Sequence, residues 1–236
     1  MPIYYGGKKI KSLYYGGKKI ASTWYGGKCV YRSLTFLAQP VQLWQWKTSY
    51  LVNSVAVDSQ SNVYAGDWVG NVTKLDSTGK QLWQWKASNT VSSVAVDSQS
   101  NVYAGDWANN VTKLDSTGKQ LWQWKASGVV NSVAVDSQSN VYAGDGAFYV
   151  TKLDSTGKQL WQWKASNTVN SVAVDSQSNV YAGDYAYNVT KLDSTGKQLW
   201  QWKASGVVNS VAVDSQSNVY AGDQANYVTK LQTAKQ

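Results

Sequence analysis

The pentapeptide Leu-Trp-Gln-Trp-Lys occurs five times in this chain, at a constant spacing of 39 residues. Its copies are Leu43–Lys47, Leu82–Lys86, Leu121–Lys125, Leu160–Lys164 and Leu199–Lys203. Aligned on this motif, the chain from about Val41 onward is one unit repeated. A period of this length is typical of arrays, solenoids and propellers, in which each unit buries its apolar face against its neighbours. We therefore expect one repeated body over residues 41–236 and a separate segment over residues 1–40.

Positive charge is concentrated ahead of the repeats. The formal net charge is +8, but residues 33–236 carry 15 Lys and 14 Asp, so the repeated body is nearly neutral. Phosphate binding needs clustered positive charge, which argues against nucleic acid as the main partner. The basic first segment is either a solvated charge run or a contact for an anionic surface.

Cysteine and tryptophan usage indicates how the chain is stabilised. Cys29 is the only cysteine, so no intrachain disulfide can form. Of the thirteen Trp, ten lie in the repeated pentapeptides, and we expect these to be core residues. No stretch resembles a signal peptide or reaches membrane-spanning length, so we expect no cleaved signal peptide and no membrane insertion.

The first segment holds a shorter repeat. Tyr4–Ile10, Tyr14–Ile20 and Trp24–Val30 share an aromatic residue, a Gly-Gly pair and lysine. Gly-Gly supplies the positive φ angles of a two-residue hairpin turn, which predicts a small β-meander. Neither face of its strands is cleanly apolar, so we expect this meander to lean on the body, another subunit or a larger assembly.

This first segment resembles the Tyr-x-Gly-Gly-Lys-Lys repeats at the start of tail and other structural proteins of phages that infect Gram-positive bacteria. The resemblance covers about 30 residues. It implies attachment to a particle or self-association through residues 1–40. It also implies a protein made in the cytoplasm that ends in a virion tail or outside the cell without a cleaved signal peptide.

Turn signals divide each 39-residue unit into four strands, A to D. In the first copy we predict strands over residues 52–57, 63–66, 72–75 and 81–86. Asp58 and Asp76 open the turns after strands A and C, where an aspartate accepts hydrogen bonds from free backbone amides. Four short antiparallel strands per unit predict one blade of a β-propeller.

The number of strands predicts an all-β, five-bladed propeller. Five A, B and C sets begin near Val52, Val91, Val130, Val169 and Val208. The last set lacks its own D strand, whereas the first D strand, Leu43–Lys47, has no set before it. We expect this N-terminal strand to complete the last blade and close the ring. The alternative is an open array, or one that lends the strand to a neighbouring chain.

The units resemble known propeller repeats. The stretch Asp76–Trp83 is similar to the Trp-docking repeat of quinoproteins, and Val55–Gly66 is similar to related repeats of bacterial quinoprotein and NHL propellers. The resemblance implies the fold over about 195 residues. The docking motif is one residue shorter here, and five blades replace the eight of the quinone-dependent dehydrogenases. Five-bladed lectins of the tachylectin type are closer in size.

Little in the chain predicts catalysis. Asp58, Asp67 and Asp76 recur in almost every unit, which is typical of structural turn residues and not of a single acid–base pair. The chain has no Glu or His, and no clustered Cys for a transition metal. A Ca²⁺ site around Asp58 or Asp67 is the remaining option for a metal. We expect no enzyme activity and no cofactor.

The five copies differ almost only in seven columns, represented in the first copy by Tyr50, Leu51, Asn53 and residues 68–71. These columns flank the D-to-A connection and form the B-to-C hairpin, two connections on the same face of a propeller. Exposed loops tolerate substitution, but exposed residues of the other face do not vary here. The varied positions are rich in aromatic and amide side chains, which suit sugar binding.

We therefore predict a non-enzymatic recognition module, of the kind that a phage or prophage tail uses to bind cell-surface glycan or cell-wall polymer. The alternative is a structural or protein-interaction propeller, recently amplified or engineered, that has no small ligand. The predicted ligand-binding residues are Tyr50, Trp68, Asn71, Trp107, Asn109, Asn110, Phe148, Tyr149, Tyr185, Tyr187, Asn188, Gln224, Asn226 and Tyr227.

Overall fold

The computed structural model describes residues 41–232 and, before them, the strand residues 3–5, 8–10, 14–15, 18–19, 22–25 and 28–32. Strands are the only regular elements in this part of the chain. No helix in these ranges is long and apolar enough to cross a membrane. Backbone contacts divide the chain into Met1–Leu43 and Trp44–Gln236, and each unit is described by itself.

The first unit contains three separate hairpins. Their strands are β1 (Ile3–Tyr5) with β2 (Lys8–Ile10), β3 (Tyr14–Tyr15) with β4 (Lys18–Lys19), and β5 (Ser22–Tyr25) with β6 (Lys28–Arg32). Each pair closes across one Gly-Gly site, as Tyr5 opposite Lys8 shows. The described strands thus pair on either side of each Gly-Gly pair as predicted, whereas the Gly-Gly turns themselves lie outside the described residues. Among the described strands, those of neighbouring hairpins share no sheet, so the continuous meander is not observed there.

The second unit consists of five antiparallel sheets, which confirms a five-bladed propeller fold. Blade 1 contains β7 (Val52–Val57), β8 (Val63–Asp67), β9 (Asn71–Leu75) and β10 (Gln81–Lys86). Blade 2 contains β11 (Val91–Val96), β12 (Val102–Asp106), β13 (Asn110–Leu114) and β14 (Gln120–Lys125). Blade 3 contains β15 (Val130–Val135), β16 (Val141–Asp145), β17 (Tyr149–Leu153) and β18 (Gln159–Lys164). Blade 4 contains β19 (Val169–Val174), β20 (Val180–Asp184), β21 (Asn188–Leu192) and β22 (Gln198–Lys203), and blade 5 contains β23 (Val208–Val213), β24 (Val219–Asp223) and β25 (Val228–Leu231).

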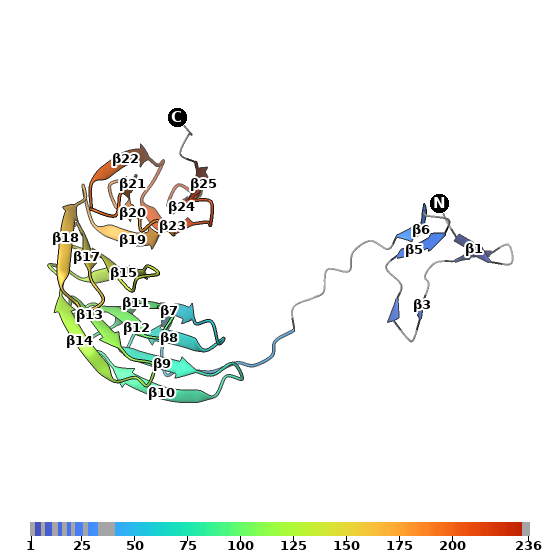
Figure 1. Ribbon diagram of the computed structural model, residues 1–236, viewed down its shortest axis with the longest axis horizontal. Helices are drawn as coiled ribbons and strands as arrows, with labels where there is room; N and C mark the ends of the chain where they lie inside the picture. The colour runs from blue at the N-terminus through green and yellow to red at the C-terminus, as the bar shows by residue number, and fades with distance from the viewer. Residues whose placement is uncertain are drawn as a thin grey trace. The chain divides into compact units, whose positions relative to one another are not determined.

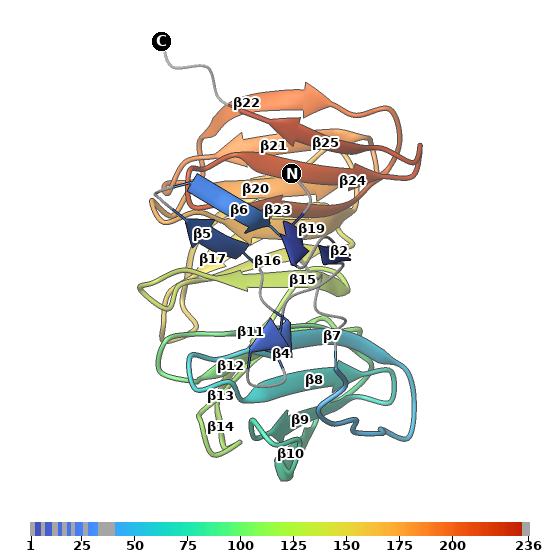
Figure 2. The ribbon, with the colours of Figure 1, turned by 90° about the vertical axis from the view of Figure 1, so that its right-hand side faces the viewer.

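The blades follow one another along an arc, with blade 1 and blade 5 at its two ends (Figure 1). Figure 2 shows the same series from the side, rising from β7–β10 to β23–β25. The A strands of neighbouring blades pack together in order, β7 on β11, β11 on β15, β15 on β19 and β19 on β23. Strand bounds in blade 1 agree with the sequence prediction to within one residue at each end.

The apolar core lies between consecutive blades. Between blades 1 and 2, Tyr64 and Val72 from one blade pack with Val91, Val94 and Leu114 from the next. Equivalent clusters join blades 2 and 3, 3 and 4, and 4 and 5. Because each blade buries one face against each neighbour, the repeated Val and Tyr positions of the interior blades are almost fully buried.

The repeated Trp residues lie at the edge of these clusters. Trp83 and Trp85 on β10 are half-buried and pack against the cluster between blades 1 and 2. The Trp83 indole N–H donates to the Ser116 carbonyl of the next blade at 3.0 Å, and the indole lies over Gly118. The prediction that these Trp form the interior is therefore wrong in part, since they cover a turn of the neighbouring blade from an outer strand.

The ring is open at the last blade. The sheet of blade 5 has three strands, and residues 43–47 form no strand, so the prediction that they complete this blade is wrong for this structure. Trp44 instead contacts blade 1, where its indole N–H donates to the Ser77 carbonyl at 3.1 Å and its ring lies over Gly79. This repeats the contact that Trp83 makes with blade 2.

Because the ring is open, blades 1 and 5 each expose a surface that a neighbouring blade covers elsewhere in the array. Val55 on β7 is 63% exposed, whereas its equivalent Val133 on β15 is 6% exposed. At the other end, Val228 on β25 is 83% exposed, and a Cβ at Gly222 would meet nothing within 4 Å. The predicted pairing of Leu43–Lys47 with blade 5 requires blades 1 and 5 to meet. They lie apart at the two ends of the arc (Figure 1).

Candidate functional site

The B-to-C hairpins and D-to-A connections form one continuous belt, called the variable face here. It consists of residues 47–51, 68–71, 86–90, 107–110, 125–129, 146–149, 164–168, 185–188, 203–207 and 224–227. In blade 1 the Trp68 amide donates to the Leu51 carbonyl at 2.9 Å, and the Ala87 amide donates to the Gly70 carbonyl at 2.8 Å. Similar bonds recur in the later blades. Each hairpin is thus tied to the connection before it and the connection after it, which confirms that the varied connections and hairpins share one face, whereas the Asn53 column lies within β7.

An aspartate shapes each hairpin, and it is buried in blades 1 to 4. Asp106, at the end of β12, is 1% exposed and accepts hydrogen bonds from the backbone and side-chain amides of Asn110 at 2.8 and 3.0 Å. Asp67 with Asn71 and Asp184 with Asn188 form the same arrangement. The carboxylate satisfies amides that would otherwise lack partners in the tight turn.

The side chains of three predicted binding residues therefore form hydrogen bonds within the protein. The side-chain amides of Asn71, Asn110 and Asn188 donate to the aspartates of their own hairpins. Asn110 and Asn188 are 6% exposed, and Asn71 is half-buried. These asparagines hold the hairpins in shape and do not project from the variable face.

Blade 3 departs from this pattern because Tyr149 replaces the asparagine. Asp145 there accepts only backbone amides from its hairpin, from Ala147 at 3.0 Å and Tyr149 at 2.9 Å. Burial without a side-chain donor raises the pKa of Asp145 above its usual range. The Tyr149 ring is half-buried beside the Lys164 ammonium, which lies 5.9 Å from the ring centroid.

The third residue of every hairpin has a left-handed backbone. Its φ is 90° at Gly70, 64° at Asn109, 78° at Phe148, 68° at Tyr187 and 69° at Asn226. Glycine and asparagine adopt this conformation readily, whereas a bulky side chain is disfavoured there. Phe148 and Tyr187 nevertheless occupy it while 36% and 43% exposed. Both rings therefore leave part of their aromatic surface accessible on the variable face, in spite of the backbone cost.

Two tryptophans from neighbouring blades meet on the variable face. The rings of Trp68 and Trp107 lie edge to face, with centroids 4.7 Å apart and planes at 71°. Both remain about two-fifths exposed, at 40% and 41%. The pair offers an aromatic surface that spans the boundary between blades 1 and 2.

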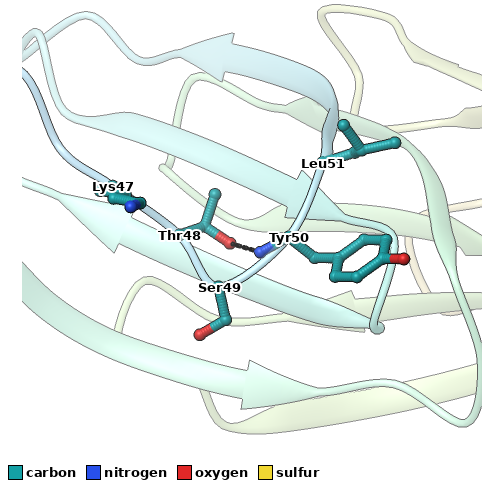
Figure 3. Close-up of a pocket in the computed structure, with 5 residues that line it drawn as sticks. All are labelled: Lys47, Thr48, Ser49, Tyr50 and Leu51. Carbon is teal, nitrogen blue, oxygen red and sulfur yellow. Dashed lines mark hydrogen bonds between the residues drawn. The ribbon is translucent and has the colours of Figure 1, made fainter.

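Tyr50 stands on the connection that leads into blade 1. This connection lines an open depression of about 400 Å³, bounded by Lys47, Thr48, Ser49, Tyr50 and Leu51 (Figure 3). The Thr48 hydroxyl donates to Asp67 at 3.1 Å and accepts from the Tyr50 amide at 3.2 Å, which holds the loop to the hairpin of blade 1. Tyr50 is 55% exposed.

The other predicted residues are more dispersed. Tyr185 and Tyr227 are exposed on the hairpins of blades 4 and 5. Gln224 and Asn226 are exposed on blade 5, where the Gln224 amide donates to Asn209 at 3.3 Å. Asn109 is half-buried at the turn of blade 2. The structure thus places the predicted aromatic residues on one face but spreads them over five blades.

Sequence reasoning missed the lysines that end the outer strands. Lys86, Lys125 and Lys203 donate to the hairpin carbonyls of Val69, Ala108 and Ala186. They do not vary between copies, so a search for varied columns passes over them. The alternation along strand D could have found them, because its last residue adjoins the D-to-A connection.

The opposite face, formed by the A-to-B and C-to-D turns, is uniform and structural. Asp58 accepts backbone amides of Gln60 and Asn62, both at 2.9 Å, as the Asx-turn prediction requires. Burial opposes its ionisation, but hydrogen bonds from Asn62, Tyr64 and Ser100 hold the pKa of Asp58 well below its usual range. An acid that stays ionised in this way stabilises a turn and is poorly suited to general acid–base work. Among the described residues, no group of three or more acidic, Cys or His side chains could hold a metal ion.

Comparison with known proteins identifies one family. The family model for outer membrane protein assembly factor BamB matches residues 39–147 and 108–235, which together span nearly all of the second unit. No curated protein matches the chain. The overlap of the two matches reflects the internal repetition of the blades.

Proposed function

The chain belongs to the propeller repeat family of outer membrane protein assembly factor BamB, and on this premise we propose that it binds cell-surface carbohydrate through its variable face. The repeat fold itself fits a non-enzymatic interaction module. Two parts of this proposal go beyond the fold and the family. They are that the ligand is carbohydrate, and that residues 1–40 attach the protein to a particle such as a phage tail.

The observation that carries the proposal is the pair of aromatic residues at left-handed positions. Phe148 and Tyr187 stand where the other copies have glycine or asparagine, at φ angles of 78° and 68°. A side chain held in a sparsely populated backbone region costs roughly 1–3 kcal/mol. Because both rings are partly exposed, an external ligand would contact an aromatic surface that the chain maintains at this backbone cost.

The chemistry of the face suits sugars. Aromatic rings stack on the C–H faces of sugar rings, and neighbouring hydroxyl and amide groups bind sugar hydroxyls. Trp68 and Trp107 supply such a surface at one blade boundary, and Tyr185 with Tyr187 supplies another on blade 4. Weak sites on several blades would act together on a polymer, since binding at one site raises the effective concentration at the next.

The test uses variants whose effects on stability and on binding diverge. Phe148→Asn with Tyr187→Asn removes both rings and places a residue that tolerates the left-handed backbone. We expect unchanged or higher stability in urea unfolding, together with loss of binding to a panel of bacterial cell-wall glycans. Trp68→Ala with Trp107→Ala should weaken binding on the same panel.

A matched control truncates exposed apolar residues away from the face. Leu82, Leu121 and Leu160 are 49%, 50% and 50% exposed on the outer strands, so replacing all three by Ala should leave binding intact. Binding that survives loss of the four aromatic rings would contradict the proposal. If the unmodified chain binds no glycan, the alternative of a structural or protein-interaction propeller is favoured, which the near-identity of the five blades also supports.

A further inference from the structure

One lysine stands at the same place in each of the five repeats. Lys86, Lys125, Lys164 and Lys203 end β10, β14, β18 and β22, and Lys47 occupies the equivalent position before blade 1. All five are exposed. Each adjoins a D-to-A connection, so the set lies on the variable face.

None of the described contacts of these lysines is with a carboxylate. Lys86, Lys125 and Lys203 donate to hairpin carbonyls, and Lys203 also donates to the side-chain amide oxygen Oδ1 of Asn188 at 3.5 Å. The Lys203 ammonium is 5.3 Å from the centroid of the Tyr187 ring, and that of Lys164 is 5.9 Å from the Tyr149 ring. A carbonyl or a ring orients an ammonium without neutralising it, and an ammonium has three N–H donors. Donors therefore remain for a ligand.

Carboxylates on this face are covered. The hairpin and connection residues carry no acid beyond the aspartate that precedes each hairpin. In blades 1 to 4 these aspartates are only 1–2% exposed, beneath the hairpin amides. The uniform face differs, because each C-to-D turn there carries both an aspartate and a lysine, such as Asp154 and Lys158. A ligand on the variable face thus meets ammonium groups but few carboxylates.

We propose that the ligand of the variable face is an acidic glycan, whose sugar rings stack on the hairpin aromatics while its anionic groups accept hydrogen bonds from the neighbouring lysines. This inference rests on the proposed function and specifies its ligand class. Blades 3 and 4 show the two elements together, as Lys164 beside Tyr149 and Lys203 beside Tyr187. Charge-assisted hydrogen bonds are stronger than neutral ones, so the acid groups add both affinity and selectivity.

Duplex DNA fits this arrangement poorly. It binds mainly through clustered positive charge that displaces counterions, and the buried aspartates bring the formal charge of this region close to zero. Its bases are also stacked inside the duplex, where the exposed rings of the hairpins cannot reach them. The variable face offers short-range ammonium donors beside rings, which suits separate acid groups on a flexible sugar polymer.

The experiment compares two polymers that differ in whether their carboxyl groups are ionised or methylated. Polygalacturonate carries a carboxylate on each sugar, and its methyl ester carries none. We expect the full chain to bind the acid at least about tenfold more tightly than the ester, the effect of one charge-assisted hydrogen bond of about 1.4 kcal/mol. Poly(glycerol phosphate) tests whether phosphate can replace carboxylate.

Paired substitutions test whether the lysines of the variable face cause the preference for the acidic polymer. Lys164→Gln with Lys203→Gln should reduce the preference for the acid over the ester. Lys158→Gln with Lys197→Gln, which removes the same charge from the uniform face, should leave it unchanged.

The outcomes separate this inference from the proposed function. If acid and ester bind equally, and both lose binding in Trp68→Ala with Trp107→Ala, the ligand is a neutral glycan and only this inference fails. If neither polymer nor any glycan of the panel binds, both fail. Duplex DNA bound as tightly as polygalacturonate would overturn the assignment to a glycan.

Discussion

At the scale of the residue, one aspartate per blade organises the uniform face. Asp136 accepts five hydrogen bonds, from the backbone of Gln138 and Asn140 and from the side chains of Asn140, Tyr142 and Ser178, each at 2.9 Å. Ser178 belongs to the next blade, so the same carboxylate joins two blades. Burial opposes its ionisation, but these donors keep the pKa of Asp136 below its usual range. Burial and the bond to Asp136 raise the pKa of Tyr142.

A lowered pKa predicts loss of stability in acid. Because the folded state favours the ionised form of Asp136, its stabilising effect is complete above the unfolded pKa of about 3.9 and disappears as the pH falls through the lower folded value. Asp136→Asn would turn an NH₂ group toward donors, and we expect it to reduce the free energy of unfolding at pH 7 by about 2 kcal/mol. Urea unfolding from pH 7 to pH 3 measures this. The variant should lose less stability below pH 4 than the unmodified chain, and parallel pH profiles would contradict the assignment.

At the scale of the element, the outer strand of each blade covers a turn of the next. Trp122 on β14 donates its indole N–H to the Ser155 carbonyl at 3.0 Å, and its ring lies over Gly157. Gly157 has a φ of 88°, and a Cβ there would approach the indole to 2.8 Å. The turn is therefore built around a residue without a side chain, for both conformational and steric reasons.

This contact predicts a difference between two glycines of blade 3. Gly157→Ala should destabilise the protein by roughly 1–3 kcal/mol, because it adds backbone strain and a clash with Trp122. Gly146→Ala is the control, since a Cβ there would come no closer than an ordinary 3.7 Å to a neighbouring atom and its φ is not positive. Thermal or urea unfolding of the two variants checks the prediction. Equal effects would mean that the indole does not cover the turn.

At the scale of the whole molecule, the arc has two unlike ends. Blade 1 exposes the apolar face of β7, and blade 5 exposes the edge strand β25. In the interior, the corresponding surfaces form the four clusters between blades. Stability is then a sum over four blade interfaces, with the end blades contributing least, as in other repeat proteins.

Equivalent valines at the end and in the middle of the arc should respond differently to truncation. Val133→Ala removes buried methyl groups and should cost about 2 kcal/mol. Val55→Ala, at the same position of blade 1, should change the free energy of unfolding by only a few tenths of a kcal/mol because this side chain is mostly exposed. Equal costs in urea unfolding would show that another surface covers β7 in solution.

Local features of the repeat could be predicted because each depends on a few consecutive residues. The turn aspartates, the alternation along the strands and the Gly-Gly hairpins are encoded within single units, so the strands of blade 1 match their predicted bounds closely. The common face of the varied columns also follows from the sequence, since successive connections alternate between the two ends of a blade.

Contacts between units decided the rest. Whether Asn110 faces solvent or Asp106 depends on the three-dimensional course of the hairpin, and both orientations are compatible with the same sequence pattern. The half-buried place of Trp83 depends on the turn of the next blade. Closure of the ring depends on the rotation between consecutive blades, which packing at each interface determines and which accumulates along the array. By itself, the sequence determined the blade and the number of its copies, and only the tertiary structure decided that the arc stays open and which side chains of the variable face remain free.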